Sequence, residues 1–440
     1  MANTYLTRTF GSSPSTTLFT WSAWVKRTKL GTQQAMISGC SSHGANTGQL
    51  IYFTNDDKLA YYAQASGTVK CNLITNAQFR DTNAWYHIVL KVDSSQSNVA
   101  NRVVFYVNNV EQSYTTTVEH AQNWDAYFML TTPTDVGRNG MNTSDYFDGV
   151  MSHMHMTHGY NYTPSTFGSV DATTGEWKIN TSPTVNYNSN GFFILKDGNT
   201  GTDHSGNSET FSSGGGTLTK TEDNPSNVFA TINALDNYRF NGTFSNGNNT
   251  VASNASVESY WTSSLGASSG KYYWEVKISA SGSDKEFIGI ADKVAEATDF
   301  SPYSGNNKMR SYYGSTGVSV VGSTGTAFGA TFGAGDIIGV AMDLDNHKIY
   351  YSKNGVFQGS GNPSTGANGL DIDTSPASGF YYAQGANIHN TASTFQTNFG
   401  NGYFGTTAVS SAGTNASNNG IFEYDVPSGF TALSTKGLNL

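Results

Sequence analysis

Alternation of apolar and polar residues is the dominant pattern in this chain of 440 residues. Side chains of an extended strand point alternately to opposite faces, so a two-residue period marks a strand with one buried face. In the segment 19–26 the apolar face consists of Phe19, Trp21, Ala23 and Val25, and the segments 85–93 and 271–278 follow the same rule. No heptad pattern occurs, so a coiled-coil shaft is not expected. The alternation predicts an all-β protein.

Turn-forming residues separate these alternating runs. Glycine is abundant, with 48 residues, whereas only 12% of the chain is charged. The pairs Asn108-Asn109 and Asn354-Gly355 stand between strand-like runs, and both tolerate the left-handed backbone of a tight hairpin. Segment 336–357 is therefore predicted to form three adjacent antiparallel strands. Many short strands joined by such turns favour packed β-sandwiches.

The alternation fades once, between about residues 197 and 237, where Asp, Gly, Asn and Ser dominate. A chain of this length has room for two or three domains. We predict two tandem antiparallel β-sandwiches with the following parts: a first sandwich over 1–197, a connector over 198–237, a second sandwich over 238–404, and a C-terminal extension over 405–440 that packs on the second sandwich.

Charge and hydropathy limit the expected partners. Lysine and arginine number 23 against 32 acidic residues, a formal charge of −9 with no basic cluster, so nucleic acid is not expected to bind. No apolar run is long enough to cross a bilayer, and the start lacks a secretory pattern. We expect synthesis in a cytosol without membrane insertion, and Cys40 and Cys71 as free thiols.

Catalytic motifs are missing from the sequence. Some β-sandwich enzymes hydrolyse β-glycans with a Glu-x-Asp-x-x-Glu row on one strand. The nearest approach here is Glu423-Tyr-Asp425, but Ser428 replaces the last carboxylate and Pro427 interrupts the strand. A metalloprotease motif is also missing. We expect no catalytic residues, with a glycan-degrading enzyme as the weaker alternative.

Metal binding is weighed on two groups of residues. His153-Met-His155-Met-Thr-His158 places His153 and His155 on one face of a predicted strand, yet one strand supplies only two convergent ligands. Acidic pairs such as Asp56-Asp57 are equally typical of turns and strand ends, although calcium stays open. We expect no metal and no cofactor.

The aromatic surplus suggests ligand binding, because sugars offer apolar ring faces and hydroxyls to an exposed aromatic plane flanked by polar groups. Such residues are equally typical of a core or an interface. The candidate ligand-binding residues are Trp24, Trp124, Trp261, Tyr303, Arg310, Tyr312 and Tyr313. The last four belong to segment 299–326, which we expect to be a long exposed recognition loop.

Several motifs resemble known families. FTWSAWVKRT (19–28), RDTNAWYHIVLKVD (80–93), VVFYVNNVE (103–111), YFDG (146–149) and TPSTFG (163–168) resemble laminin-G-like, concanavalin-type jelly rolls. GKYYWEVKI (270–278), FIGIA (287–291), the segment 335–355 and FQTNFG (395–400) resemble the SPRY sandwich. The two modules in this order, with the connector and PSGFTALST (427–435), are similar to virion proteins of tailed bacteriophages of aquatic hosts.

This resemblance implies a non-catalytic virion structural protein. The expected role is tail-associated, as part of a fibre, spike or adaptor that attaches the particle to host-surface polysaccharide. The alternative is a head-decoration or appendage-anchoring protein that binds only other virion proteins. A homo-oligomer is expected, with a trimer favoured, because appendages follow the symmetry of their mount and multivalency strengthens weak glycan binding.

Overall fold

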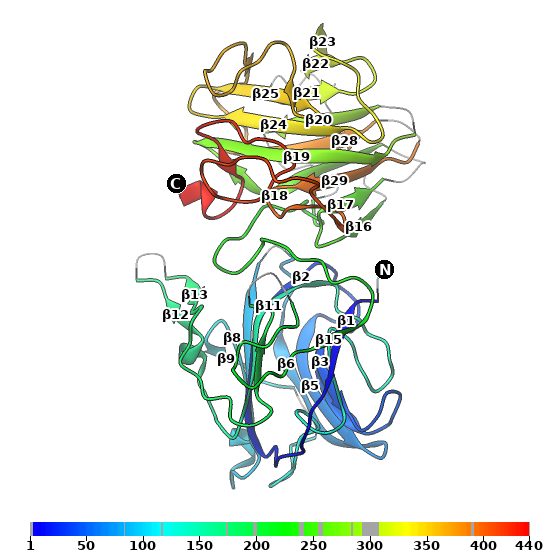
Figure 1. The fold of residues 1–440 in the computed structure, drawn as a ribbon, viewed down its shortest axis with the longest axis vertical. Coiled ribbons are helices and arrows are strands. Elements are labelled where there is room, and N and C mark those ends of the chain that lie inside the picture. Colours follow the sequence, from blue (N-terminus) through cyan, green and yellow to red (C-terminus); the bar gives the residue numbers. More distant parts are fainter. Residues whose placement is uncertain are drawn as a thin grey trace. The chain divides into compact units, whose positions relative to one another are not determined.

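The computed structural model describes residues 3–82, 84–115, 118–172, 175–196, 200–236, 242–253, 258–282, 285–292, 308–388 and 391–439. It divides into two compact units, Met1–Lys220 and Thr221–Leu440 (Figure 1). The described residues form 32 strands and three short 3₁₀ turns without an α-helix, so the all-β prediction is confirmed. None of these elements is a helix long and apolar enough to span a membrane.

The amino-terminal unit is a sandwich of two antiparallel sheets, seen face to face in Figure 1. The seven-stranded sheet runs β15 (Ser212–Gly215), β1 (Tyr5–Thr9), β10 (Pro133–Val136), β3 (Gln34–Cys40), β4 (Gly48–Phe53), β5 (Lys58–Ala65) and β6 (Thr68–Gln78). The six-stranded sheet runs β14 (Phe192–Ile194), β11 (Gly149–His158), β2 (Leu18–Arg27), β7 (Tyr86–Asp93), β8 (Val103–Val107) and β9 (Val110–Glu111). β12 (Gly168–Val170) pairs with β13 (Trp177–Ile179), and η1 (Val99–Asn101) and η2 (Pro164–Thr166) are single turns.

The predicted alternation defines the core of this unit. The inward face of β2 carries Phe19, Trp21, Ala23 and Val25, all within one hydrophobic cluster. On β7, Ile88, Leu90 and Val92 join the same cluster. The turn after β8 is the predicted hairpin, since Asn108 and Asn109 have φ values of 48° and 68°. A two-residue period therefore located the buried faces correctly.

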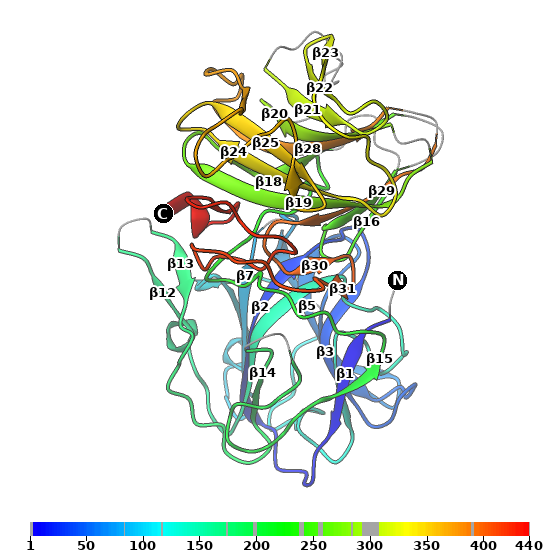
Figure 2. The ribbon, with the colours of Figure 1, turned by 45° about the horizontal axis from the view of Figure 1, so that its top comes forward.

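The carboxy-terminal unit is a second sandwich, whose sheets can be followed in Figure 2. The nine-stranded sheet runs β16 (Thr243–Ser245), β17 (Thr250–Ala252), β29 (Thr394–Asn398), β19 (Lys271–Ala280), β24 (Ile337–Asp343), β25 (Lys348–Lys353) and β26 (Val356–Phe357), with β27 (Leu370–Asp371) on β25 and β32 (Thr431–Ala432) on β19. The other sheet runs β18 (Ser259–Ala267), β28 (Tyr381–Asn387), β20 (Glu286–Ala291), β21 (Arg310–Tyr313), β22 (Val318–Val321) and β23 (Thr324–Ala327). β30 (Tyr403–Phe404) pairs with β31 (Thr407–Ala408), and η3 (Gly437–Asn439) ends the described chain.

The structure assigns the two segments predicted outside the sandwiches as follows. The connector predicted over 198–237 is divided, because β15 pairs with β1 whereas Phe229 and Ile232 lie in the core of the second unit. The segment 405–440 contributes Phe422, Phe430 and Leu433 to that same core. In both polar segments, a few widely spaced apolar residues are therefore enough to anchor the chain to the core of the second unit.

The predicted recognition loop over 299–326 is wrong for its described part. Residues 310–313, 318–321 and 324–327 form β21, β22 and β23, which extend the sheet beyond β20. These strands are only four residues long, and Ser, Gly and Thr are frequent in the segment 299–326 that contains them, so the segment resembled a loop. Residues 293–307 lie outside the described residues.

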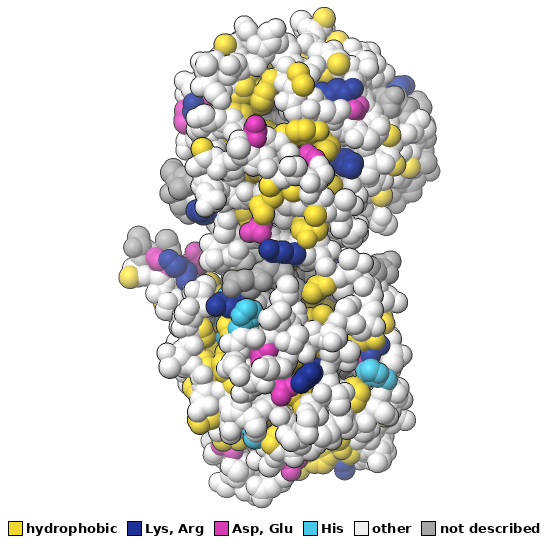
Figure 3. Space-filling view, viewed as in Figure 1, with side chains coloured by type: hydrophobic (Ala, Val, Ile, Leu, Met, Phe, Trp, Pro, Cys, Tyr) yellow, Lys and Arg dark blue, Asp and Glu magenta, His cyan; other side chains and the backbone are white. Residues whose placement is uncertain are grey.

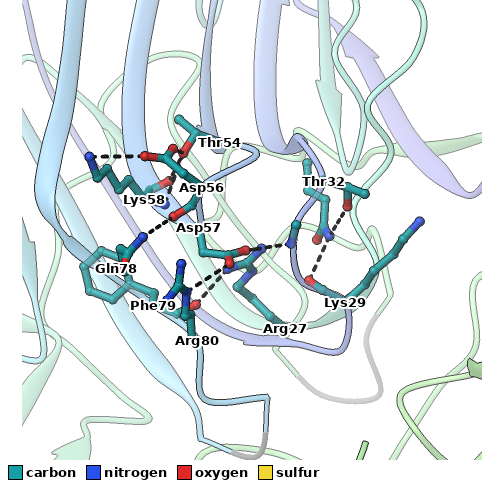
Figure 4. A network of polar contacts seen from close by, with 12 residues as sticks. Arg27, Lys29, Thr32, Thr54, Asp56, Asp57, Lys58, Gln78, Phe79 and Arg80 are labelled. Carbon is teal, nitrogen blue, oxygen red and sulfur yellow. Dashed lines mark hydrogen bonds and ion pairs between the residues drawn. The ribbon is translucent and has the colours of Figure 1, made fainter. Parts of the chain in front are cut away.

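A buried ion pair fixes one end of the amino-terminal sandwich (Figure 4). The guanidinium of Arg27, whose side chain is 0% exposed, donates to Asp57 Oδ1 at 3.0 Å and to the Phe79 carbonyl at 2.7 Å. It also lies over the Phe53 ring, 4.3 Å from the centroid. Burial lowers the pKa of Arg27 against the pull of Asp57. Removing one partner of such a pair leaves a buried charge uncompensated.

We predict that Asp57→Asn destabilises the amino-terminal unit by about 3 to 5 kcal/mol, because it keeps the side-chain shape but removes the countercharge of Arg27. The neighbouring Asp56→Asn is the matched control, since the Asp56 side chain is 56% exposed and its pair with Lys58 is worth at most about 1 kcal/mol. Urea unfolding of both variants measures the difference. Equal midpoints for the two variants would show that the pair is not needed.

The outer face of the six-stranded sheet is also buried. Directly opposed residues stack on it, with ring centroids 4.8 Å apart for Trp24 and His87 and 4.0 Å apart for His155 and Phe193. Residues 160–172 and 175–190, here called the cover segment, lie over these rings. From it, Phe167 packs on His155 with centroids 5.0 Å apart. The sheet thus has two buried faces, and nearly every residue of β2 is buried as a result.

Two hydrogen bonds join the cover segment to the buried imidazoles. The Trp177 indole donates to Nδ1 of His87 at 2.9 Å, which places the His87 proton on Nε2, beside Ser22 Oγ at 2.9 Å. The Tyr187 hydroxyl lies 2.7 Å from Nδ1 of His155. Burial lowers the pKa of His87 to about 3 and lowers that of His155 well below its ordinary value. Both imidazoles are neutral at pH 7.

We predict that the amino-terminal unit loses stability as the pH falls from about 6.5 toward 3. Both folded-state pKa values lie below the unfolded value of 6.5, so the unfolded chain binds more protons there. The expected loss is about 1.4 kcal/mol per imidazole for each pH unit. The stability of the amino-terminal unit at each pH can be measured in the full chain from hydrogen exchange of the β2 and β7 amides as a function of urea concentration.

His87→Asn removes one of three buried imidazoles whose pKa is lowered by burial, the others being His155 and His120, so it should reduce the pH dependence by about a third. His204→Asn is the control, because His204 is exposed and should leave the slope unchanged. A His87→Asn slope equal to that of the unmodified protein would contradict the assignment.

Candidate ligand-binding depression

An open depression of about 540 Å³ lies on the amino-terminal unit. It is lined by Val185, Asn186, Tyr187, Asn188, Ser189, Ser205 and Asn207, and is here called the amide depression. Five of these residues belong to the cover segment, whereas Ser205 and Asn207 follow β14. The size lies in the range of small-ligand sites, and every lining side chain is uncharged.

Local hydrogen bonds hold the depression in shape. Asn207 Nδ2 donates to the Gly191 carbonyl at 2.8 Å and to the Asn188 carbonyl. Ser205 Oγ donates to Asp203 Oδ2 at 2.7 Å, and Asn186 Oδ1 accepts from the Asn188 amide N–H at 3.0 Å. These short-range bonds are typical of Asn and Ser in turns. They fix the backbone and leave part of the side-chain polar groups facing solvent.

Two tyrosines lie beside the depression. The rings of Tyr160 and Tyr162 stack with centroids 5.8 Å apart and an interplanar angle of 21°. Asn186 joins them to the depression: its Nδ2 donates to the Tyr160 hydroxyl at 2.7 Å, and its backbone N–H donates to the Tyr162 hydroxyl at 2.9 Å. Both rings are half-buried. The result is an aromatic surface next to uncharged amides, the pairing that sugar recognition uses.

The floor of the depression connects to the buried histidines. Tyr187 is half-buried, and burial raises the pKa of its hydroxyl, which bonds to His155. His158 lies at the edge, with Nε2 2.9 Å from the Ser15 carbonyl and Nδ1 3.3 Å from Ser189 Oγ. The depression is therefore built on the same segment that covers the sheet.

The sequence-predicted tryptophans lie elsewhere and are buried. Trp24, predicted on a polar face, is 4% exposed and stacks on His87. Trp261 is fully buried in the second core, against Phe395. Trp124 is half-buried, 6.4 Å from both His120 and Tyr127 by ring centroid. The two buried rings have no exposed plane for a sugar, which corrects the expectation for them.

The candidates of the second unit are strand residues. Tyr312 is fully buried, and its hydroxyl donates to the Ala330 carbonyl. Tyr313 is 8% exposed and stacks on Phe287 at 4.2 Å. Their exposure was predicted from a loop that the structure forms as β21, so that expectation is wrong.

Arg310 is half-buried at the start of β21, and its guanidinium donates to the Asp371 carbonyl at 2.7 Å and to Ser319 Oγ at 3.1 Å. These bonds tie β21 to neighbouring strands. Tyr303 lies outside the described residues. The structure therefore brings none of the described candidates into a common exposed site.

The histidine motif adopts a different geometry from the one expected. A register shift interrupts the pairing of β11 with β2 between Ser152 and His155, and His153 has a φ of 47°. His153 Nδ1 lies 2.8 Å from Ser152 Oγ. Within the described part of the chain, no three His, Cys, Asp or Glu side chains form a group suited to a metal ion.

Sequence reasoning missed the amide depression. Its signal is the interleaving of Tyr and Asn in Tyr160-Asn-Tyr162 and Asn186-Tyr-Asn188, and neither stretch is among the predicted candidates. Joining these two stretches also requires the cover segment to fold back on itself. Only the structure shows that return, through the bonds of Asn186 to both tyrosines.

Comparisons with known proteins agree with the sheet topology. Residues 2–159 match the family model of the concanavalin A-like lectin/glucanases superfamily (Laminin_G_3), and residues 271–370 match the SPRY domain model. No curated protein matches the chain.

Solved structures similar to the chain include the SPRY domain of human HERC1, with 17% identity, a TM-score of 0.31, and coverage of 38% of this chain and 96% of that one. The CBM40 domain of a Ruminococcus gnavus IT-sialidase, bound to α2,3-sialyllactose, has 13% identity, a TM-score of 0.28, and coverage of 35% and 80%. The family matches and the observed sheets together show a concanavalin-like sandwich followed by a SPRY sandwich.

Proposed function

We propose that this protein is a non-catalytic attachment protein that binds host-surface polysaccharide at the amide depression. The observation that carries the proposal is the juxtaposition of stacked Tyr160 and Tyr162 with the uncharged amides of Asn186 and Asn188. Sugar rings offer apolar faces and closely spaced hydroxyls, which such a surface complements. An open site suits a segment of a long polymer, because the chain can enter and leave without threading.

The acidic motif nearest to a glycosidase row supports a non-catalytic role. The Glu423 carboxylate accepts from the Ser410 N–H at 2.7 Å, and Asp425 accepts from Thr414 N at 2.6 Å and Thr414 Oγ1 at 2.8 Å. Both carboxylates hold a neighbouring loop in place. Residues 423–425 also lie outside any strand, unlike the carboxylate row of a β-glycan hydrolase.

The resemblance of the sequence motifs to tailed-phage proteins extends the proposal to a place of action. The protein would be a tail-associated virion component, assembled with other virion proteins as a homo-oligomer, with a trimer favoured. On the face shown in Figure 3, Lys and Arg side chains are scattered rather than gathered, and most of the surface is uncharged. Such a surface fits contact with proteins and glycans better than contact with nucleic acid.

We predict that labelled protein binds host cells and that mild periodate treatment of the cells, which cleaves vicinal diols of surface glycans, removes this binding. Tyr160→Ala should weaken binding by about fivefold, since a lost aromatic contact is worth about 1 kcal/mol. Tyr106→Ala is the matched control, because Tyr106 is a half-buried tyrosine of β8 whose hydroxyl bonds to Glu111.

Undiminished binding to periodate-treated cells would contradict a glycan receptor. Immunogold labelling of intact particles tests the location: gold at the tail supports the tail assignment, whereas gold over the whole head supports the decoration alternative.

A further inference from the structure

We infer that the amide depression selects an uncharged sugar unit over an anionic one. This inference rests on the proposed function and narrows it to neutral polysaccharides, meaning polymers of hexoses or N-acetylhexosamines without carboxylate, sulfate or phosphate groups. It follows from which polar atoms of the depression are already bonded and which are left for a ligand.

The unused groups of the depression comprise both donors and acceptors. Within the described residues, the Asn188 side-chain amide makes no hydrogen bond, so its oxygen and both N–H groups are available. Asn207 uses its Nδ2 on two backbone carbonyls and keeps its Oδ1 free to accept. The Tyr160 hydroxyl accepts from Asn186 and can donate its own proton. The unused groups in and beside the depression therefore include both donors and acceptors.

This combination of donors and acceptors favours hydroxyl groups as ligands and disfavours anions. A sugar hydroxyl both donates and accepts, so it can satisfy an amide oxygen and an amide N–H that lie near each other. A carboxylate or sulfate only accepts, so the oxygens of Asn188 and Asn207 would face it without a proton between them. An unpaired polar group in a binding site costs affinity, which is how such sites discriminate between ligands.

The charges nearest the depression do not favour an anion either. Asp203 lies behind Ser205, where its carboxylate accepts from Phe193 N at 2.8 Å, Ser205 Oγ at 2.7 Å and Glu209 N at 2.8 Å. His158 is occupied by Ser15 and Ser189. Neither Lys nor Arg lines the depression. Charge-assisted bonds, which anion sites normally use, are therefore missing from the described lining.

The test is affinity electrophoresis of the full chain in gels containing matched polymers. Purified host surface polysaccharide is compared before and after chemical sulfation, and dextran with dextran sulfate serves as a second pair. We expect retardation by the neutral host polymer that is unchanged between 50 and 500 mM salt, and at least tenfold weaker retardation by its sulfated form.

The variant that removes the unused amide is Asn188→Gly, because Asn188 has a φ of 51° and glycine accepts this conformation without strain. It should weaken binding to the neutral polymer by about three- to tenfold. Asn109→Gly is the control, since Asn109 is exposed in the β8–β9 turn with a φ of 68°.

Three outcomes would overturn the inference, and they separate it from the proposed function. Stronger retardation by the sulfated polymer that Asn188→Gly reduces would keep the depression as a glycan site and reject its neutral selectivity. Neutral binding that Asn188→Gly leaves unchanged would place the site elsewhere. No retardation by any host polymer would reject the proposed function together with the inference.

Discussion

Two-sided burial of the six-stranded sheet is the constraint on which the amino-terminal unit depends. β2 and β7 bury their inward residues against the other sheet and their outward residues, including Trp24 and His87, beneath the cover segment. Buried polar groups need partners, so each imidazole on this face requires a bond that the cover segment or the sheet supplies. The Trp177 indole meets this need for His87, and Tyr187 meets it for His155.

This constraint also explains where the candidate site lies. The cover segment is anchored to the sheet at two points, because Trp177 bonds to His87 and Tyr187 bonds to His155. Its solvent-facing side can therefore present a fixed set of polar groups. Asn186 and Asn188 are the sequence neighbours of Tyr187. The bond of Tyr187 to His155 therefore also fixes where these two asparagines lie. A site built on an anchored segment loses little conformational freedom when a ligand binds. The layer that covers the sheet and the layer that meets a ligand are one stretch of chain.

The fold was largely predictable because its signal is local. A two-residue period identifies the buried face of β2 or β19 from a few consecutive residues, and Asn108-Asn109 marks its turn in the same way. The period says nothing about what covers the opposite face. Trp24 was therefore placed on a polar face as a candidate for either ligand binding or an interface, and the structure shows it buried. Short strands such as β21 also escape detection, because four residues carry too little pattern.

The site was not predictable from the sequence for a related reason. Its groups come from stretches near residues 160, 186 and 207, and only the folding of the cover segment and of the chain after β14 brings them together. The candidates chosen from the sequence were three tryptophans, three tyrosines and one arginine, residue types that often dominate binding energy. In this protein those residues serve the core or tie strands together, as Trp261 and Arg310 do. Tyrosine and asparagine are left to form the exposed polar surface.

The central claim is that host polysaccharide binds on the cover segment, and hydrogen–deuterium exchange of the full chain with and without the purified polymer tests it most directly. The account predicts slower exchange in peptides that cover residues 159–162, 185–189 and 203–208, with no change in β21, β22 or β23. Protection confined to the carboxy-terminal unit, or unchanged exchange throughout the cover segment at a polymer concentration that retards the protein, would contradict it.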